Sequence, residues 1–324
     1  MIPQGAFYLG DGTSNYTITS GSSTNPYYVS SDGAITRSTT VGNIYCSSSS
    51  TTLPGSIPLA FPVGYDSMYV MKYEISQGQY AAFLNTLSSD QAANRAYIVN
   101  ASRINIAGTW PNYTTTFPHR AMGYLSWQDL SAYLDWAALR PMTETEFEKI
   151  CRGPNYPVAG EYAWGSSTIN DCNTVSNDGT ATEKNTSLPA AGCGIANYNG
   201  DYISGPMRCG FAAGVATDRL QAGSSYYGVM EMSGNIGELC VNIYDATGLA
   251  FSSTNGDGYL TGSPTPGYAN ASNWPSSVSG TAGVTFRGGG YSETYGYLRV
   301  SDRYIYHDTS CSGRNANRGG RGIR

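Results

Sequence analysis

Glycine- and proline-rich loops limit how much regular structure this chain can form. Of its 324 residues, 40 are glycine and 15 are proline. Residues 165–225 and 245–285 combine these with Ser, Asn and Thr in turn dipeptides, and they show little hydrophobic periodicity. Loops this long in a compact chain are usually functional or disordered. No linker is recognisable, because apolar segments recur on both sides of each loop. We expect a single loop-rich α+β domain over residues 1–324.

Two main helices can be predicted from capping and periodicity. Ser76 and Gln79 form a capping-box pattern ahead of apolar residues spaced three and four apart, which predicts about three helical turns. A second apolar face runs from Trp127 to Ala138, and Pro141 ends that helix after Arg140. The remaining structure should consist of short strands and long loops.

A third, shorter helix should follow the second. Thr143 and Glu146 form another capping box. Glu144, Glu146 and Glu148 suit a helix N-terminus because carboxylates interact favourably with its dipole. Positions two apart on a helix face different sides, so we expect these carboxylates to be structural and not a catalytic pair.

Charge and hydropathy exclude several classes of protein. Only 13% of the residues are charged and the net charge is −5, which argues against a nucleic-acid-binding protein. No apolar run approaches the ~18 residues of a membrane-spanning helix. The first residues, Met1 to Gln4, lack the basic and then apolar pattern of a signal peptide. If the protein is exported, we expect that a signal has been removed or that a virion or another carrier takes it out of the cell.

The cysteines indicate neither a zinc site nor a disulfide framework. There are seven of them, an odd number, with no C-x-x-C spacing and only two histidines in the chain. We expect mostly buried free cysteines, with one loop disulfide, such as Cys172 with Cys193, left open as an alternative.

A series of motifs along the whole chain resembles formylglycine-generating enzyme domains. The motifs are Ile2–Gly10, Tyr73-Glu74-Ile75, Leu125-Ser126-Trp127, Arg140–Glu148, Tyr162–Gly165, Ala196-Asn197-Tyr198, Gly228–Glu238, Phe286–Gly290 and Gly322-Ile323-Arg324. The resemblance implies an elaborated C-type lectin fold that is loop-rich, with two main helices and small antiparallel sheets.

The chemistry of those enzymes does not follow from the resemblance. They oxidise their substrate with two cysteines that hold copper, just after the Arg-Gly-Gly motif; thiolates are soft ligands that suit Cu(I). The corresponding positions here are Glu293 and Leu298. The iron-dependent sulfoxide synthases of the same superfamily need several histidines, and this chain has two. We therefore expect no enzymatic activity.

The resemblance also implies calcium sites. One would use the side chains of Asn235 and Glu238, whose oxygens suit Ca²⁺. The alternative is that Glu238 pairs with an arginine of the C-terminal segment. The second site would include Asn197 and Tyr198, but its carboxylate position is Cys209, so we expect that site to be lost.

The C-terminal segment, residues 286–324, has a composition of its own. It contains seven of the 18 basic residues, all arginine, and three of the 23 acidic ones. Tyrosines alternate there with small polar residues, which is typical of antibody paratopes; the alternative is a tyrosine-rich turn in a chain with 27 tyrosines. We expect Arg287, Arg299, Arg303, Arg321 and Arg324 to anchor loops through forked hydrogen bonds. The candidate ligand-binding residues are Tyr291, Ser292, Thr294, Tyr295, Tyr297, Ser301, Asp302, Tyr304, Ile305, Tyr306, His307 and Asp308.

This segment is also similar to the variable proteins of diversity-generating retroelements, which share the formylglycine-enzyme-like lectin scaffold. In their genes, adenines of the C-terminal coding segment are randomised. An AAC codon altered only at its adenines never encodes Glu, Lys, Gln, Trp or Met. Between Tyr291 and Asn317 only Glu293 belongs to that excluded set.

The sequence therefore predicts a non-catalytic receptor or adhesin. Its C-terminal face would bind a protein or glycan on a cell or phage-target surface, and the protein would be extracellular, at the cell surface or on a virion. We expect the face to be contiguous, with the candidate tyrosines more than half exposed. The alternatives are a sulfatase-modifying oxidoreductase and a surface-layer or tail-fibre module without a specific ligand.

Overall fold

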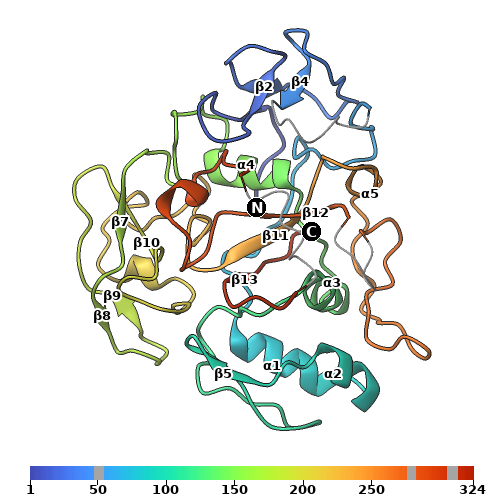
Figure 1. Cartoon of the computed structure of the whole chain (residues 1–324), viewed down its shortest axis with the longest axis vertical. Coiled ribbons are helices and arrows are strands. Elements are labelled where there is room, and N and C mark those ends of the chain that lie inside the picture. Colours follow the sequence, from blue (N-terminus) through green and yellow to red (C-terminus); the bar gives the residue numbers. More distant parts are fainter. Residues whose placement is uncertain (47–54, 276–281, 305–312) are drawn as a thin grey trace.

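A small three-stranded sheet lies at the centre of the computed structural model (Figure 1), which describes residues 1–46, 55–275, 282–304 and 313–324. Strand β11 (Gly237–Val241) pairs antiparallel with β12 (Val284–Arg287) and parallel with β13 (Arg318–Gly319). Every residue of the three strands is buried. The sheet therefore brings the Gly-Asn-x-x-Glu and Arg-Gly-Gly motifs side by side, with Glu238 opposite Arg287.

The other strands form two-stranded sheets around this centre. Two antiparallel pairs near the N-terminus are β1 (Phe7–Leu9) with β3 (Tyr27–Val29) and β2 (Ile18–Ser20) with β4 (Ile44–Cys46). The remaining pairs are β5 (Val99–Ala101) with β6 (Ile104–Ile106), β7 (Ile169–Asp171) with β10 (Gly194–Ala196), and β8 (Val175–Ser176) with β9 (Lys184–Asn185). The mixed helix and small-sheet class is as predicted. Most of the small sheets are antiparallel as expected, but the pairs β7–β10 and β11–β13 are parallel.

The predicted capping boxes all form. Ser76 caps α1 (Gln77–Thr86), whose face of Tyr80, Phe83 and Leu84 is buried. Helix α3 (Trp127–Trp136) ends before the predicted residue, because Ala138 adopts the left-handed conformation with φ of 55°. Thr143 caps α4 (Glu144–Arg152), which covers one side of the central sheet (Figure 1).

The structure also contains elements that the sequence patterns did not predict. Helix α2 (Ser89–Arg95) follows α1 and has its own capping box, formed by Ser88 and Gln91. Short helical turns occur at α5 (Ala246–Leu249), η1 (Phe211–Gly214) and η2 (Tyr295–Leu298). None of the described helices is long and apolar enough to cross a membrane.

Both chain ends join one internal segment. Ile2 exchanges backbone hydrogen bonds with Met68, and Arg324 exchanges them with Tyr69. Trp127 and Trp164 are fully buried, in the two largest apolar clusters. Cys172 and Cys193 are both free, so a disulfide between them is wrong for this structure; Cys172 is fully buried and behaves as a small apolar residue.

Candidate functional site

Five of the candidate binding residues form what we call the outer row: Ser292, Thr294, Tyr295, Tyr297 and Tyr304. The tyrosine rings of Tyr295 and Tyr304 are 56% and 51% exposed, and Ser292 and Thr294 are also exposed. Tyr297 is half-buried. Tyr295 and Tyr297 lie on η2, a single turn that places both side chains near the surface. The outer row is thus accessible from solvent.

The expected exposure of the tyrosines is wrong for Tyr291 and, less strongly, for the half-buried Tyr297, and burial also removes Ser301 and Asp302 from the expected binding face. Tyr291 is 5% exposed, packs with Ala121 and Ile236, and hydrogen-bonds Ser102. Ser301 and Asp302 are also buried. Tyr291, Ser301 and Asp302 therefore support the segment from below. The remaining candidates, Ile305, Tyr306, His307 and Asp308, lie outside the described residues.

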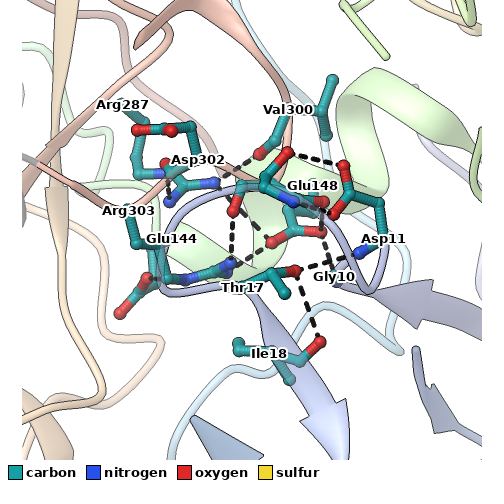
Figure 2. A network of polar contacts seen from close by, with 12 residues as sticks. Gly10, Asp11, Thr17, Ile18, Glu144, Glu148, Arg287, Val300, Asp302 and Arg303 are labelled. Atoms are coloured by element: carbon teal, nitrogen blue, oxygen red, sulfur yellow. Dashed lines mark hydrogen bonds and ion pairs between the residues drawn. The ribbon is translucent and has the colours of Figure 1, made fainter. Parts of the chain in front are cut away.

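An arginine–carboxylate network, Glu144, Glu148, Arg152, Arg287 and Arg303, holds the base of this segment (Figure 2). The Nε atom of Arg303 lies 2.9 Å from a Glu144 carboxylate oxygen, and its Nη2 donates to Glu148. Arg287 donates from Nη1 to the Asp302 carbonyl oxygen at 2.7 Å, and also to the Val300 carbonyl. The expected anchoring role of Arg287 and Arg303 is confirmed, because both are fully buried and fork between several acceptors.

Glu148 is the centre of this network. One of its oxygens accepts hydrogen bonds from Arg152 at 2.9 Å, from the Gly10 backbone N–H at 2.8 Å and from the Ser301 hydroxyl at 3.1 Å. Burial alone would raise the pKa of the Glu148 carboxyl, but Arg303, Arg152 and Arg287 together lower that pKa to about 2. The ionised Glu148 carboxylate therefore links α4, the N-terminal loop and the C-terminal segment through its hydrogen bonds.

Sequence patterns indicated that Glu144 and Glu148 have a structural role, but they did not indicate which residues these carboxylates bind. Only the four-residue spacing of Glu148 and Arg152 was a local signal, since such pairs meet on a helix. Their partners Arg287 and Arg303 are more than 130 residues away, and nothing local links them.

Glu293 and Leu298, the residues that the resemblance matches to copper-binding cysteines, have structural contacts in this chain. Glu293 accepts a hydrogen bond from the Gly290 N–H at 2.8 Å and another from the Asn317 side chain. Its backbone carbonyl accepts from the Asn199 N–H at 2.8 Å. Leu298 is fully buried in an apolar cluster that includes Trp164. One position thus holds a loop-closing carboxylate and the other a core side chain, and neither is a soft metal ligand.

The residues at the first implied calcium site are engaged mainly with other parts of the protein. Asn235 donates from Nδ2 to Glu74 at 2.6 Å, and its Oδ1 accepts from the Met207 N–H at 2.7 Å. Glu238 accepts from Nε of Arg321 at 2.6 Å. Asn235 and one oxygen of Glu238 are thereby committed to protein partners, and the alternative pairing of Glu238 with a C-terminal arginine is present; the other oxygen of Glu238, Oε2, is buried without a hydrogen-bond partner. Over the described ranges, no three Asp, Glu, His or Cys residues come together as a metal site.

The carboxylates beside Arg321 are unusually costly to ionise. Burial raises the pKa of Glu231 to about 7, although Arg321 opposes the rise. Burial and the charge of Glu231 raise the pKa of Glu74 well above its ordinary value. At the second implied site, Cys209 has an Sγ that contacts the Glu74 carbonyl, and burial raises the pKa of its thiol. These groups therefore tend to hold protons.

Comparisons with known proteins place the chain in a family. No curated protein matches it. A solved structure, Treponema denticola variable protein 1, aligns over 99% of this chain and 92% of its own, with 14% identity and a TM-score of 0.44, a weak similarity. The sequence model of the sulfatase-modifying factor enzyme 1-like domain matches residues 60–321. That range includes the α1, α3 and α4 segments, the central sheet and the outer row, and the chain therefore belongs to the sulfatase-modifying factor enzyme 1-like domain family.

Proposed function

We propose that this chain is a non-catalytic ligand-binding protein, a receptor or adhesin. It is one formylglycine-generating-enzyme-like domain with a C-type lectin fold over residues 1–324, and its ligand-binding segment lies within residues 286–324. It serves as the variable protein of a diversity-generating retroelement. Its ligand is a protein or glycan on a cell or phage-target surface, and it acts outside the cell, at a cell surface or on a virion.

One observation carries the proposal: accessible side chains stand on a base that is fixed independently of them. The outer row is solvent-accessible, whereas Arg287 and Arg303 beneath it are fully buried and bonded to α4. Exposed side chains can change with little effect on stability, because surface substitutions usually cost within ~0.5 kcal/mol. Such a layered arrangement suits a surface whose composition varies while its backbone stays in place.

The same segment argues against oxidoreductase chemistry. A copper-dependent oxidation needs two thiolates, and the positions that match are Glu293 and Leu298. Glu293 is committed to Gly290 and Asn317, and Leu298 has no polar atom in its side chain. Membership in the family therefore does not imply that this chain catalyses the reaction of the family's enzymes.

A display library tests the binding face. Positions 292, 294, 295, 297 and 304 would be randomised together, and the library selected against a defined target such as hen lysozyme. We expect folded members with target-specific binding, because these side chains lie above the arginine–carboxylate network. A matched library at the buried positions 291, 301 and 302 should yield mostly unfolded members. Equal loss of folding in both libraries would contradict the proposal.

Two further observations test the enzyme alternative and the genetic origin. Incubation of the purified chain with a sulfatase cysteine peptide, Cu(I) and oxygen should yield no formylglycine above that of a protein-free control, and formation of this aldehyde would contradict the non-catalytic function. The gene should lie beside a reverse transcriptase and a near-copy of its 3′ coding segment that differs only at adenines. A neighbourhood without both would exclude the retroelement assignment.

A further inference from the structure

The outer row is in contact with a loop from the other end of the chain. Tyr304 stacks with Tyr297, at 5.5 Å between ring centroids with 28° between the planes, and with Tyr16, at 6.0 Å with 24°. Tyr16 belongs to the N-terminal loop Gly10–Thr17, which Figure 2 shows beside Glu148 and Asp302. We call these three rings the tyrosine stack. It joins one ring from residues 10–17 to two rings of the C-terminal segment.

The backbone beneath the stack is fixed on both sides. The Arg303 N–H donates to the Asn15 carbonyl oxygen at 2.9 Å, and the Asn15 side chain donates to Asp302 at 3.1 Å. Gly10 donates to Glu148, which also binds Arg303. Tyr16 is therefore held in a defined position next to Tyr304, without the ordering cost that a loose loop would have on binding.

From this geometry we infer that Tyr16 and its loop form a constant part of the ligand-binding face, and that the face recognises a folded protein. The inference rests on the proposed binding function and names both a further surface and the class of partner. The N-terminal loop lies outside the C-terminal segment in which variation is proposed, so it offers the same contacts whatever residues the outer row contains.

The ring arrangement favours a protein partner over a glycan. A sugar stacks against an open aromatic face, but the Tyr304 ring already stacks with two neighbouring rings, Tyr16 and Tyr297. The guanidinium of Arg299 lies over Tyr295, 5.9 Å from the ring centroid. These rings therefore offer edges and hydroxyl groups, which are the contacts that tyrosine-rich paratopes make with protein surfaces.

Of the charged residues near the stack that the structure describes, Asp302 and Arg299 are directed inward. Asp302 is bonded to the Tyr304 N–H at 3.0 Å and to Asn15, and Arg299 is engaged with Tyr162 and the Tyr295 ring. The surface formed by the tyrosine stack thus presents rings and hydroxyls with little outward charge. Its complement is an uncharged patch of a protein surface, where such aromatic anchors usually provide much of the binding energy.

The test uses the full chain on two arrays, one of purified extracellular protein domains and one of glycans. The dissociation constant of a protein that binds would then be measured for Tyr16→Ala, Tyr16→Phe and Tyr304→Ala. Tyr259→Ala is the matched control, since Tyr259 is 74% exposed on a loop that is bonded to α3 instead. Melting curves of each variant establish that it is folded.

We expect a protein partner whose affinity falls at least tenfold in Tyr16→Ala and Tyr304→Ala, less in Tyr16→Phe, and within twofold in Tyr259→Ala. Loss of affinity in Tyr304→Ala without loss in Tyr16→Ala would show that Tyr16 is not part of the ligand-binding face and would leave the proposed function intact. Binding to glycans alone would overturn the partner class. An affinity that is unchanged in both Tyr16→Ala and Tyr304→Ala, or no binding on either array, would overturn this inference and the proposed function together.

Discussion

Substitution of Glu148 tests whether the arginine–carboxylate network fixes the binding segment. Glu148→Gln keeps the size of the side chain and removes its charge. Arg303 would keep Glu144 as a partner, but Arg287, whose Nη2 lies 3.6 Å from Glu148, would lose its nearest carboxylate. Removal of one partner from a buried ion pair costs about 3–5 kcal/mol. We expect the free energy of unfolding at pH 7 to fall by that amount.

The pKa of Glu148 gives an independent value for the same quantity. A carboxyl with a pKa of about 2 in the folded chain instead of 4.5 contributes ~3 kcal/mol. Because the folded value is the lower one, this contribution is present above pH 4.5 and is lost as the pH falls towards 2. The wild-type protein should therefore lose more stability between pH 5 and pH 2 than Glu148→Gln does.

Denaturant titrations at pH 7, 5 and 2 would measure both effects. Asp90→Asn is the control, because Asp90 is an exposed carboxylate in the first turn of α2. Amide hydrogen exchange at Arg303 and Tyr304 should become faster in Glu148→Gln, since their backbone lies on the network. A loss below 1 kcal/mol at pH 7, with unchanged exchange at these amides, would refute the anchoring argument.

Three other outcomes can be measured on the same protein. Burial raises the pKa of the Glu231 carboxyl to about 7, so the folded protein gains stability at low pH by holding this proton. That stability should be lost as the pH rises from 5 to 8, and Glu231→Gln should flatten this part of a plot of melting temperature against pH. Trp127→Ala and Trp164→Ala should each lower the free energy of unfolding in urea by about 3–5 kcal/mol, whereas Tyr295→Ser should change it by no more than ~0.5 kcal/mol. A similar loss of stability in all three variants would contradict the division of the C-terminal segment into exposed and supporting residues. Melting curves in calcium and in chelator should coincide, because Arg321 already pairs with Glu238; a rise with calcium concentration would contradict that pairing.

Local patterns in the sequence were sufficient to predict three of the helices and to indicate the resemblance to the family. Ser76 and Thr143 each lie three residues before the side chain that completes a capping box, and both helices begin where those patterns place them; the helix that starts at Trp127 was predicted from its apolar face, and the structure adds a capping box at Ser126. A capping box depends only on residues within one turn, so the sequence contains all the information that it needs. The same patterns missed α2, although Ser88 and Gln91 carry an identical signal.

Tertiary structure alone decided which members of the C-terminal segment face solvent. Tyr291 and Tyr295 are the same residue type four positions apart, yet one packs against Ala121 and the other is 56% exposed. The segment has neither helical nor strand periodicity beyond η2, so no repeat indicates its inner side. Burial there depends on the segments that pack against it.

Those packing partners come from distant parts of the chain. Glu148 joins Gly10 and Arg303, and Tyr16 reaches Tyr304, through contacts separated by more than 130 residues. The sequence by itself determined which side chains are available: arginines to anchor, carboxylates to receive them, and tyrosines to bind. Only folding decided which arginine meets which carboxylate, because an ion pair or a ring stack between remote segments depends on the path of the whole backbone and leaves no local pattern.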